Sequence, residues 1–147
     1  MKITLCGSIA FYSEMLSTKE NLEKIGHKVE LPPKEVKDKE GNPISVEDYY
    51  QIRKNSKEDD RWVWDRKKEA MLEHFDKIKW ADAILVLNYD KKNIRGYIGS
   101  NTLIEMGLAL FLNKKIYLLN SVPDLPYKEE ILGVRPVIIH GNLNKIR

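Results

Sequence analysis

The run Ala83-Ile84-Leu85-Val86-Leu87 decides the fold of this chain. It has the length of a strand and no polar residue, which is typical of a strand buried on both faces in a parallel sheet. Further apolar runs of strand length lie at residues 2–6, 27–31, 115–119 and 134–139. Segments with helical period separate most of these runs, and this alternation indicates successive β-α-β units. We therefore predict an α/β fold, with a parallel sheet covered by helices on both faces.

The connections between the strands carry their own signals. Residues 11–25 predict the first crossover helix, and Gly26 is well placed to end it. The second crossover begins with a charged, proline-containing stretch at residues 32–43, which we expect to be an exposed loop. Ser45-Val46-Glu47-Asp48 then has the spacing of a capping box, so a helix is expected to start there. Another helix is predicted over residues 60–79.

The composition limits the class of protein. A length of 147 residues fits one domain, which we place at residues 1–147. The formal net charge is only +3 and the basic residues are interleaved with acidic ones, so we expect no nucleic-acid partner. No segment approaches the ~20 apolar residues that a membrane span needs, and the first apolar run is too short for a signal peptide. We therefore expect no membrane partner and a cytoplasmic location.

Cysteine and histidine usage gives no sign of a metal site. Cys6 is the only cysteine, and its place in an apolar run favours a buried structural thiol. His27, His74 and His140 lie far apart, with no Cys or His at ligand spacing. We therefore assign no metal ligands.

The segment at residues 101–113 is the most informative helix. Its apolar residues cover the whole circumference, and they are Leu103, Ile104, Met106, Leu108, Leu110, Phe111 and Leu112. A helix of this kind is expected to be covered on all sides. Because a chain of this length has few layers to cover both faces of a helix, we expect a partner subunit on the second face, in a homodimer or a larger homo-oligomer.

One acid, Glu105, stands within this apolar helix. Burial of a lone carboxylate costs several kcal/mol unless it is paired or hydrogen-bonded. Glu105 lies about one turn after the expected N-cap, Ser100 or Asn101, so the helix dipole favours its charged form. Asn101 and Thr102 share its face and can orient it. In open parallel sheets this region binds ligands. Alternatively, Glu105 caps a loop or meets a lysine at an interface.

Two loops flank the same region. Gly7, Ser8 and Ile9 follow the first strand, where backbone N–H groups can approach a phosphate or a sugar, although a tight turn is the alternative. The loop at residues 88–100 carries glycines, an aromatic and the cations Lys91, Lys92 and Arg95. It is either a lid or a solvated loop.

Taken together, these motifs resemble the nucleoside 2-deoxyribosyltransferase family, which includes the 2′-deoxynucleoside 5′-phosphate N-hydrolases. The resemblance extends from Met1 to about Leu119 and leaves residues 32–60 unmatched. The segments that carry it are Cys6-Gly7-Ser8-Ile9, Trp80-Ala81-Asp82-Ala83-Ile84-Leu85-Val86, Glu105-Met106-Gly107-Leu108-Ala109 and Asn113-Lys114-Lys115-Ile116.

The resemblance implies a flavodoxin-like, doubly wound, five-stranded parallel sheet in a homodimer or a dimer of dimers. It implies cleavage of the bond between deoxyribose and base, without a metal or an organic cofactor, on a small nucleoside or nucleotide. Glu105 maps onto the nucleophile of the family. The residues that we place at the substrate are Gly7, Ser8, Ile9, Asp82, Gly99, Ser100 and Asn101, although Asp82 is also placed to brace a strand or a loop.

The sequence departs from the family pattern at particular positions. His74 stands where the family has an acidic residue eight positions before Asp82. The segment at residues 101–104 replaces a glycine-rich approach to the nucleophile, and Ala10 stands where the phosphate-preferring branch has an arginine. An imidazole titrates near neutral pH, so we predict that His74 donates a proton to the departing base, with a core or interface histidine as the alternative.

Our hypothesis from the sequence is an enzyme that transfers deoxyribose or hydrolyses the N-glycosidic bond through a covalent intermediate on Glu105. The competing hypothesis is a non-catalytic nucleotide-binding or sensor protein on the same fold. A structural or regulatory dimer without a ligand is the third.

Overall fold

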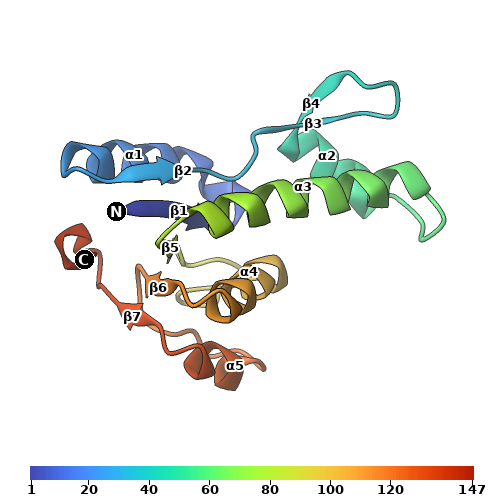
Figure 1. The fold of residues 1–147 in the computed structure, drawn as a ribbon. Helices are drawn as coiled ribbons and strands as arrows, with labels where there is room; N and C mark the ends of the chain where they lie inside the picture. Colours follow the sequence, from blue (N-terminus) through green and yellow to red (C-terminus); the bar gives the residue numbers. More distant parts are fainter.

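The computed structural model describes all residues, 1–147, and contains the predicted parallel sheet (Figure 1). Its strands follow the order β2-β1-β5-β6-β7, and every neighbouring pair is parallel. The strands are β1 (Lys2–Cys6), β2 (Lys28–Glu30), β5 (Ala83–Val86), β6 (Lys115–Leu118) and β7 (Val137–Ile138). This is the flavodoxin-like order, in which the connections change direction between β1 and β5. The prediction of a doubly wound five-stranded sheet is confirmed.

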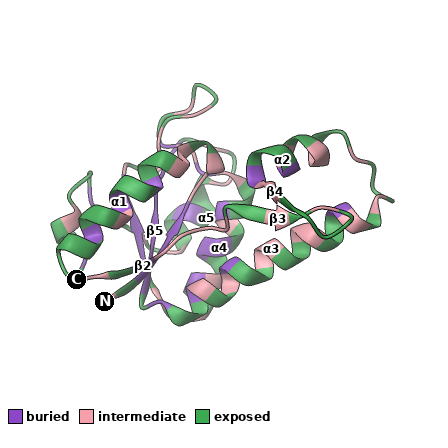
Figure 2. Cartoon of the chain, turned by 90° about the horizontal axis from the view of Figure 1, so that it is seen from above, coloured by how far each residue is buried: buried purple, intermediate pink, exposed green.

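Helices cover both faces of the sheet, as predicted. Residues of β1 alternate between the two faces, because successive side chains of a strand point in opposite directions. Ile3 and Leu5 share one core with the α1 (Tyr12–Lys24) residues Met15 and Leu22. On the other face lie α3 (Arg61–Trp80), α4 (Ser100–Phe111) and α5 (Lys128–Gly133). They contribute Ile78, Met106 and Ile131 to a second core, to which β1 adds Cys6. Figure 2 shows buried residues on the sheet and on the helix sides that face it.

No helix in the structure combines the length and the apolar character that crossing a membrane requires.

The second crossover contains more structure than predicted. Residues 32–43 were expected to be an exposed loop, but they contain most of an antiparallel hairpin, β3 (Glu35–Lys37) and β4 (Pro43–Ser45). The side chain of Asp38 closes its turn, because Oδ1 accepts hydrogen bonds from the backbone N–H groups of Glu40 and Asn42. Local turn chemistry therefore makes a hairpin from a stretch with little apolar content.

Helix α2 (Val46–Lys54) begins where the capping-box spacing predicts. Ser45 is its N-cap, and the Ser45 Oγ accepts a hydrogen bond of 3.1 Å from the backbone N–H of Asp48. In Figure 1, the hairpin and α2 lie together beside the end of α3 that is farther from the N-terminus of the chain. The hairpin and α2 belong to residues 32–60, the segment that the resemblance to the family leaves unmatched. Their placement brings this segment to one end of the sheet.

One expectation for α4 is wrong. Its N-cap is Gly99, not Ser100 or Asn101, because both of those residues already belong to the helix. Its outer side is uncovered within the chain, since Phe111 is 85% exposed and Ile104 and Leu110 are about half exposed, and the expected partner subunit on that side stays a prediction. The helix is therefore apolar all round but packed on one side only.

Asn88 joins the loops that follow β5 and β6. It is fully buried, and its Nδ2 donates to the backbone carbonyls of Asn120 at 3.1 Å and Ser121 at 3.0 Å. Its Oδ1 accepts a 2.9 Å hydrogen bond from the Asn120 N–H. Gly96 fits beneath this network with a φ of +67°, and a Cβ there would lie 2.7 Å from the Ser121 carbonyl oxygen. These contacts fix the start and the middle of the segment that leads into α4.

We expect Asn88→Ala to lower the free energy of unfolding by about 3 kcal/mol, because it leaves several buried backbone groups without partners. Asn21→Ala on the exposed side of α1 is the matched control and should change stability by less than about 0.5 kcal/mol. Urea unfolding measures both values. Equal stability of the two variants would show that the hydrogen bonds of Asn88 do not stabilise the fold.

Candidate active site

A cavity of about 620 Å³ lies at the carboxyl ends of β1 and β5. Residues that follow β1 form one wall, and the start of α4 forms another. Helix α3 contributes a third wall, and α2 contributes Val46, Tyr49 and Arg53 among others. This position is the topological switch point of the sheet, where open α/β folds bind ligands.

Most of the residues that the sequence assigns to a site line this cavity. They are Gly7, Ser8, Ile9, His74, Gly99, Ser100, Asn101 and Glu105. Asp82 does not, because it precedes β5 and lies at the opposite edge of the sheet. There its Oδ2 accepts a 2.8 Å hydrogen bond from the backbone N–H of Lys2, which lowers the pKa of that carboxyl. Its assignment to the substrate is corrected: Asp82 braces the first strand.

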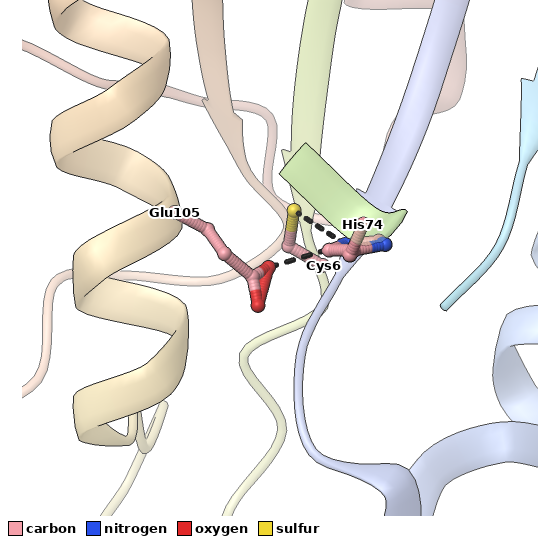
Figure 3. Close-up of side chains that lie close together, drawn as sticks. All are labelled: Cys6, His74 and Glu105. Atoms are coloured by element: carbon pink, nitrogen blue, oxygen red, sulfur yellow. Dashed lines mark hydrogen bonds and ion pairs between the residues drawn. The ribbon is translucent and has the colours of Figure 1, made fainter. Parts of the chain in front are cut away.

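Glu105 projects from α4 and is only 4% exposed (Figure 3). Its Oε1 accepts a 3.0 Å hydrogen bond from Asn101 Nδ2, one turn earlier on the same face. The other carboxylate oxygen, Oε2, lies 3.2 Å from His74 Nε2 on α3. This second contact lacks hydrogen-bond geometry, and Oε2 has no hydrogen-bond partner. Neighbours from two helices therefore hold the carboxylate at the edge of the cavity.

Cys6 completes a buried cluster with these two residues. Its Sγ lies 3.6 Å from His74 Nε2, although 68 positions separate the two residues in the sequence. Burial raises the pKa of the Cys6 thiol well above its usual value, and the nearby charge of Glu105 raises it further. The thiol therefore stays protonated at neutral pH.

The loop after β1 approaches the rest of the structure closely. A Cβ on Gly7 would lie 3.2 Å from the Leu87 carbonyl oxygen, at a φ of +152°. The next residue, Ser8, accepts a 2.7 Å hydrogen bond at Oγ from Lys91 Nζ. Lys91 therefore links the loop after β5 to the loop after β1, beside the cavity.

Helix α2 supplies side chains that were not assigned to the site from the sequence. The Tyr49 hydroxyl donates to the Val63 carbonyl, which fixes α2 against α3. The Arg53 guanidinium stacks 4.7 Å from the centre of the Tyr49 ring and 5.4 Å from that of Tyr50. The sequence signal that could have found these side chains is the group of aromatic and basic residues, Tyr49, Tyr50 and Arg53, in the helix that follows Ser45.

The cavity carries more positive than negative side chains. Its acids are Glu47 and Glu105, and its cations are Arg53, Lys67, Lys91 and Lys92. None of these cations takes part in a salt bridge. Burial lowers the pKa of the Lys67 amine, Arg53 lowers it further, and Glu105 opposes both effects. Arg95 of the same loop does not line the cavity. The arrangement favours a ligand with an anionic group.

Comparison with known proteins gives structural likenesses only. No family model matches the chain, and no curated protein matches it by sequence. A 2-deoxyribosyltransferase from Bacillus psychrosaccharolyticus is 19% identical with a TM-score of 0.47, over 81% of this chain and 72% of that chain. The CMP N-glycosidase BcmB from Clostridium botulinum is 17% identical with a TM-score of 0.49, over 94% of this chain and 88% of that chain. The first is named after the family that the sequence motifs resemble, but likenesses at this level assign no activity to this chain.

Proposed function

We propose that this protein cleaves the N-glycosidic bond of a deoxynucleoside or deoxynucleotide, by hydrolysis or by transfer of the deoxyribose to another base. The observation that carries this proposal is the Glu105 carboxylate, buried at the edge of a cavity and oriented by Asn101. A volume of about 620 Å³ suits a ligand of nucleotide size. The resemblance of the sequence motifs to the deoxyribosyltransferase family adds support.

In the proposed reaction, a Glu105 oxygen attacks C1′ of the sugar as the bond from C1′ to the base nitrogen breaks. The bonding electrons leave with the base, which takes a proton from the imidazolium of His74. The product of this step is a deoxyribosyl ester of Glu105. Water or an acceptor base then attacks C1′ and releases the carboxylate, and the proton of the attacking group returns to His74. Two inversions at C1′ give net retention.

The other lining residues have positioning roles in this proposal. The backbone of Gly7, Ser8 and Ile9 lies beside the cavity and is suited to the sugar and its 5′ end. Gly99 and Ser100 border the cavity at the start of α4, where free N–H groups of a helix favour negative charge.

A non-catalytic nucleotide-binding or sensor protein is the second candidate. It is favoured by the contact of Glu105 Oε2 with His74, because that oxygen faces an imidazole rather than open space. The two candidates differ in one observable. Both predict that nucleotides raise the melting temperature, and only the enzyme releases a free base.

We also propose that the protein forms a homodimer through the outer face of α4. Phe111, Leu110 and Ile104 expose apolar surface there, and such a cluster is costly to leave in water. A second copy of the same helix is self-complementary in a twofold contact.

We expect Glu105→Gln to reduce base release by roughly 10³-fold or more while the fold is kept, because it preserves volume and removes the attacking charge. Glu73→Gln is the matched control, since Glu73 precedes His74 on α3 but points to solvent, paired with Lys77. Chromatography of the free base measures both. Turnover by Glu105→Gln at the rate of the control would remove Glu105 from the chemistry.

We expect deoxynucleoside 5′-monophosphates to bind more tightly than the corresponding nucleosides, and the difference to shrink with added salt. Lys91→Met should weaken nucleotide binding by roughly 10-fold or more, because it removes a cation beside Ser8. Arg95→Met, in the same loop but outside the cavity, should have little effect. Calorimetric titration of the Glu105→Gln background measures affinity without turnover. Equal affinity for both ligands at low salt would contradict a phosphate subsite.

Sedimentation at micromolar concentration should show a dimer or a larger assembly that Phe111→Glu dissociates. Leu16→Glu places the same charge at an exposed leucine of α1 and should leave the assembly intact. A monomeric unaltered protein would contradict the proposed interface.

A further inference from the structure

Three electron-pair donors converge at one point beneath the cavity. They are Cys6 Sγ, His74 Nε2 and Glu105 Oε2, and they lie within 4.8 Å of one another (Figure 3). All three residues are buried, and they come from β1, α3 and α4. Oε2 has no hydrogen-bond partner in this arrangement. Lone pairs that face each other at 3.2 to 3.6 Å require something positive between them, either a proton or a metal ion.

The spacing of these atoms suits a tetrahedral ion. With Zn–S near 2.3 Å and Zn–N near 2.0 Å, a tetrahedral angle places sulfur and nitrogen about 3.5 Å apart, and nitrogen and a carboxylate oxygen about 3.3 Å apart. The observed distances are 3.6 Å from Sγ to Nε2 and 3.2 Å from Nε2 to Oε2. The remaining pair, the sulfur and a Glu105 carboxylate oxygen, lies within 4.8 Å.

The geometry points to a binding site for a thiophilic divalent cation such as Zn²⁺ on Cys6, His74 and Glu105. Thiolate, imidazole and carboxylate are the ligand types that Zn²⁺ takes in proteins, and three protein ligands leave a fourth position open. His74 and Glu105 line the cavity, which gives the ion a path of entry. On binding, the Cys6 thiol releases its proton to solvent and His74 binds through a neutral ring nitrogen. The sequence does not predict this site, because its three ligands come from separate elements and show no short, regular spacing along the chain.

Metal binding at this position has a consequence for the proposed reaction. The ion takes a lone pair of Glu105 Oε2 and the lone pair of His74 Nε2, so it blocks both the attacking group and the proton donor. We therefore expect Zn²⁺ to inhibit base release. This consequence rests on the proposed function, whereas the binding site itself does not.

Cobalt is the probe for the site, because a Co²⁺–thiolate bond gives a charge-transfer band in the near ultraviolet. Cys6 is the only cysteine, so the band can only report this residue. We expect the metal-free full chain to develop the band with Co²⁺ and to lose it when Zn²⁺ is added. Glu105→Gln and His74→Phe should each weaken Co²⁺ binding by more than roughly 10-fold, a loss that even outer-shell changes reach. Glu73→Gln should leave the affinity unchanged.

The outcomes separate the alternatives. Absence of the band in the folded chain at millimolar Co²⁺ would overturn the site and leave a cluster held by protons. A band with the same affinity in Glu105→Gln and His74→Phe would also overturn it, because Cys6 would then bind without its neighbours. Circular dichroism identifies any variant that fails to fold, and the other variant then carries the test. A band in a protein whose metal-free form releases no base from deoxynucleosides or deoxynucleotides would refute the proposed function and support the metal site.

Discussion

Parallel pairing of β1 with β5 is the constraint on which the site depends. The register places Cys6 beside Val86, so both strands end at the same edge of the sheet. From there one chain segment continues into Gly7 and Ser8, and the other reaches Lys91 and then the start of α4. Gly7, Ser8 and Lys91 of the candidate site are therefore placed by the loops that follow these two strands. A shift of the register by one residue would move Cys6 to the other face of the sheet and separate it from His74.

Burial of the Glu105 carboxylate makes the surrounding polar groups necessary. An unpaired buried carboxylate costs several kcal/mol, and here Asn101, His74 and the cation Lys67 offset that cost. The neighbours of a buried charge in a core would normally satisfy it completely. In this chain Oε2 has no hydrogen-bond partner and lies 3.2 Å from His74 Nε2.

Much of the fold could be predicted from the sequence because its signals are local. The apolar runs predict the strands, the Ser45 capping box predicts the start of α2, and the helical spacing predicts the contact of Asn101 with Glu105. The hairpin at residues 35–45 was missed because its side-chain turn has no periodic pattern. The cluster of Cys6 with His74 was missed for a different reason, since only the packing of α3 on the sheet brings positions so distant in the chain together.

The hydrogen bond between Lys91 and Ser8 has a consequence for recognition. A lysine side chain loses considerable rotamer freedom when a ligand fixes it. Here the folded chain already holds the amine against the loop after β1, before any ligand arrives. In the proposed function, an anionic group would therefore meet a preorganised cation, and little further ordering would oppose its binding. A neutral ligand would give the amine no charged partner in place of Ser8.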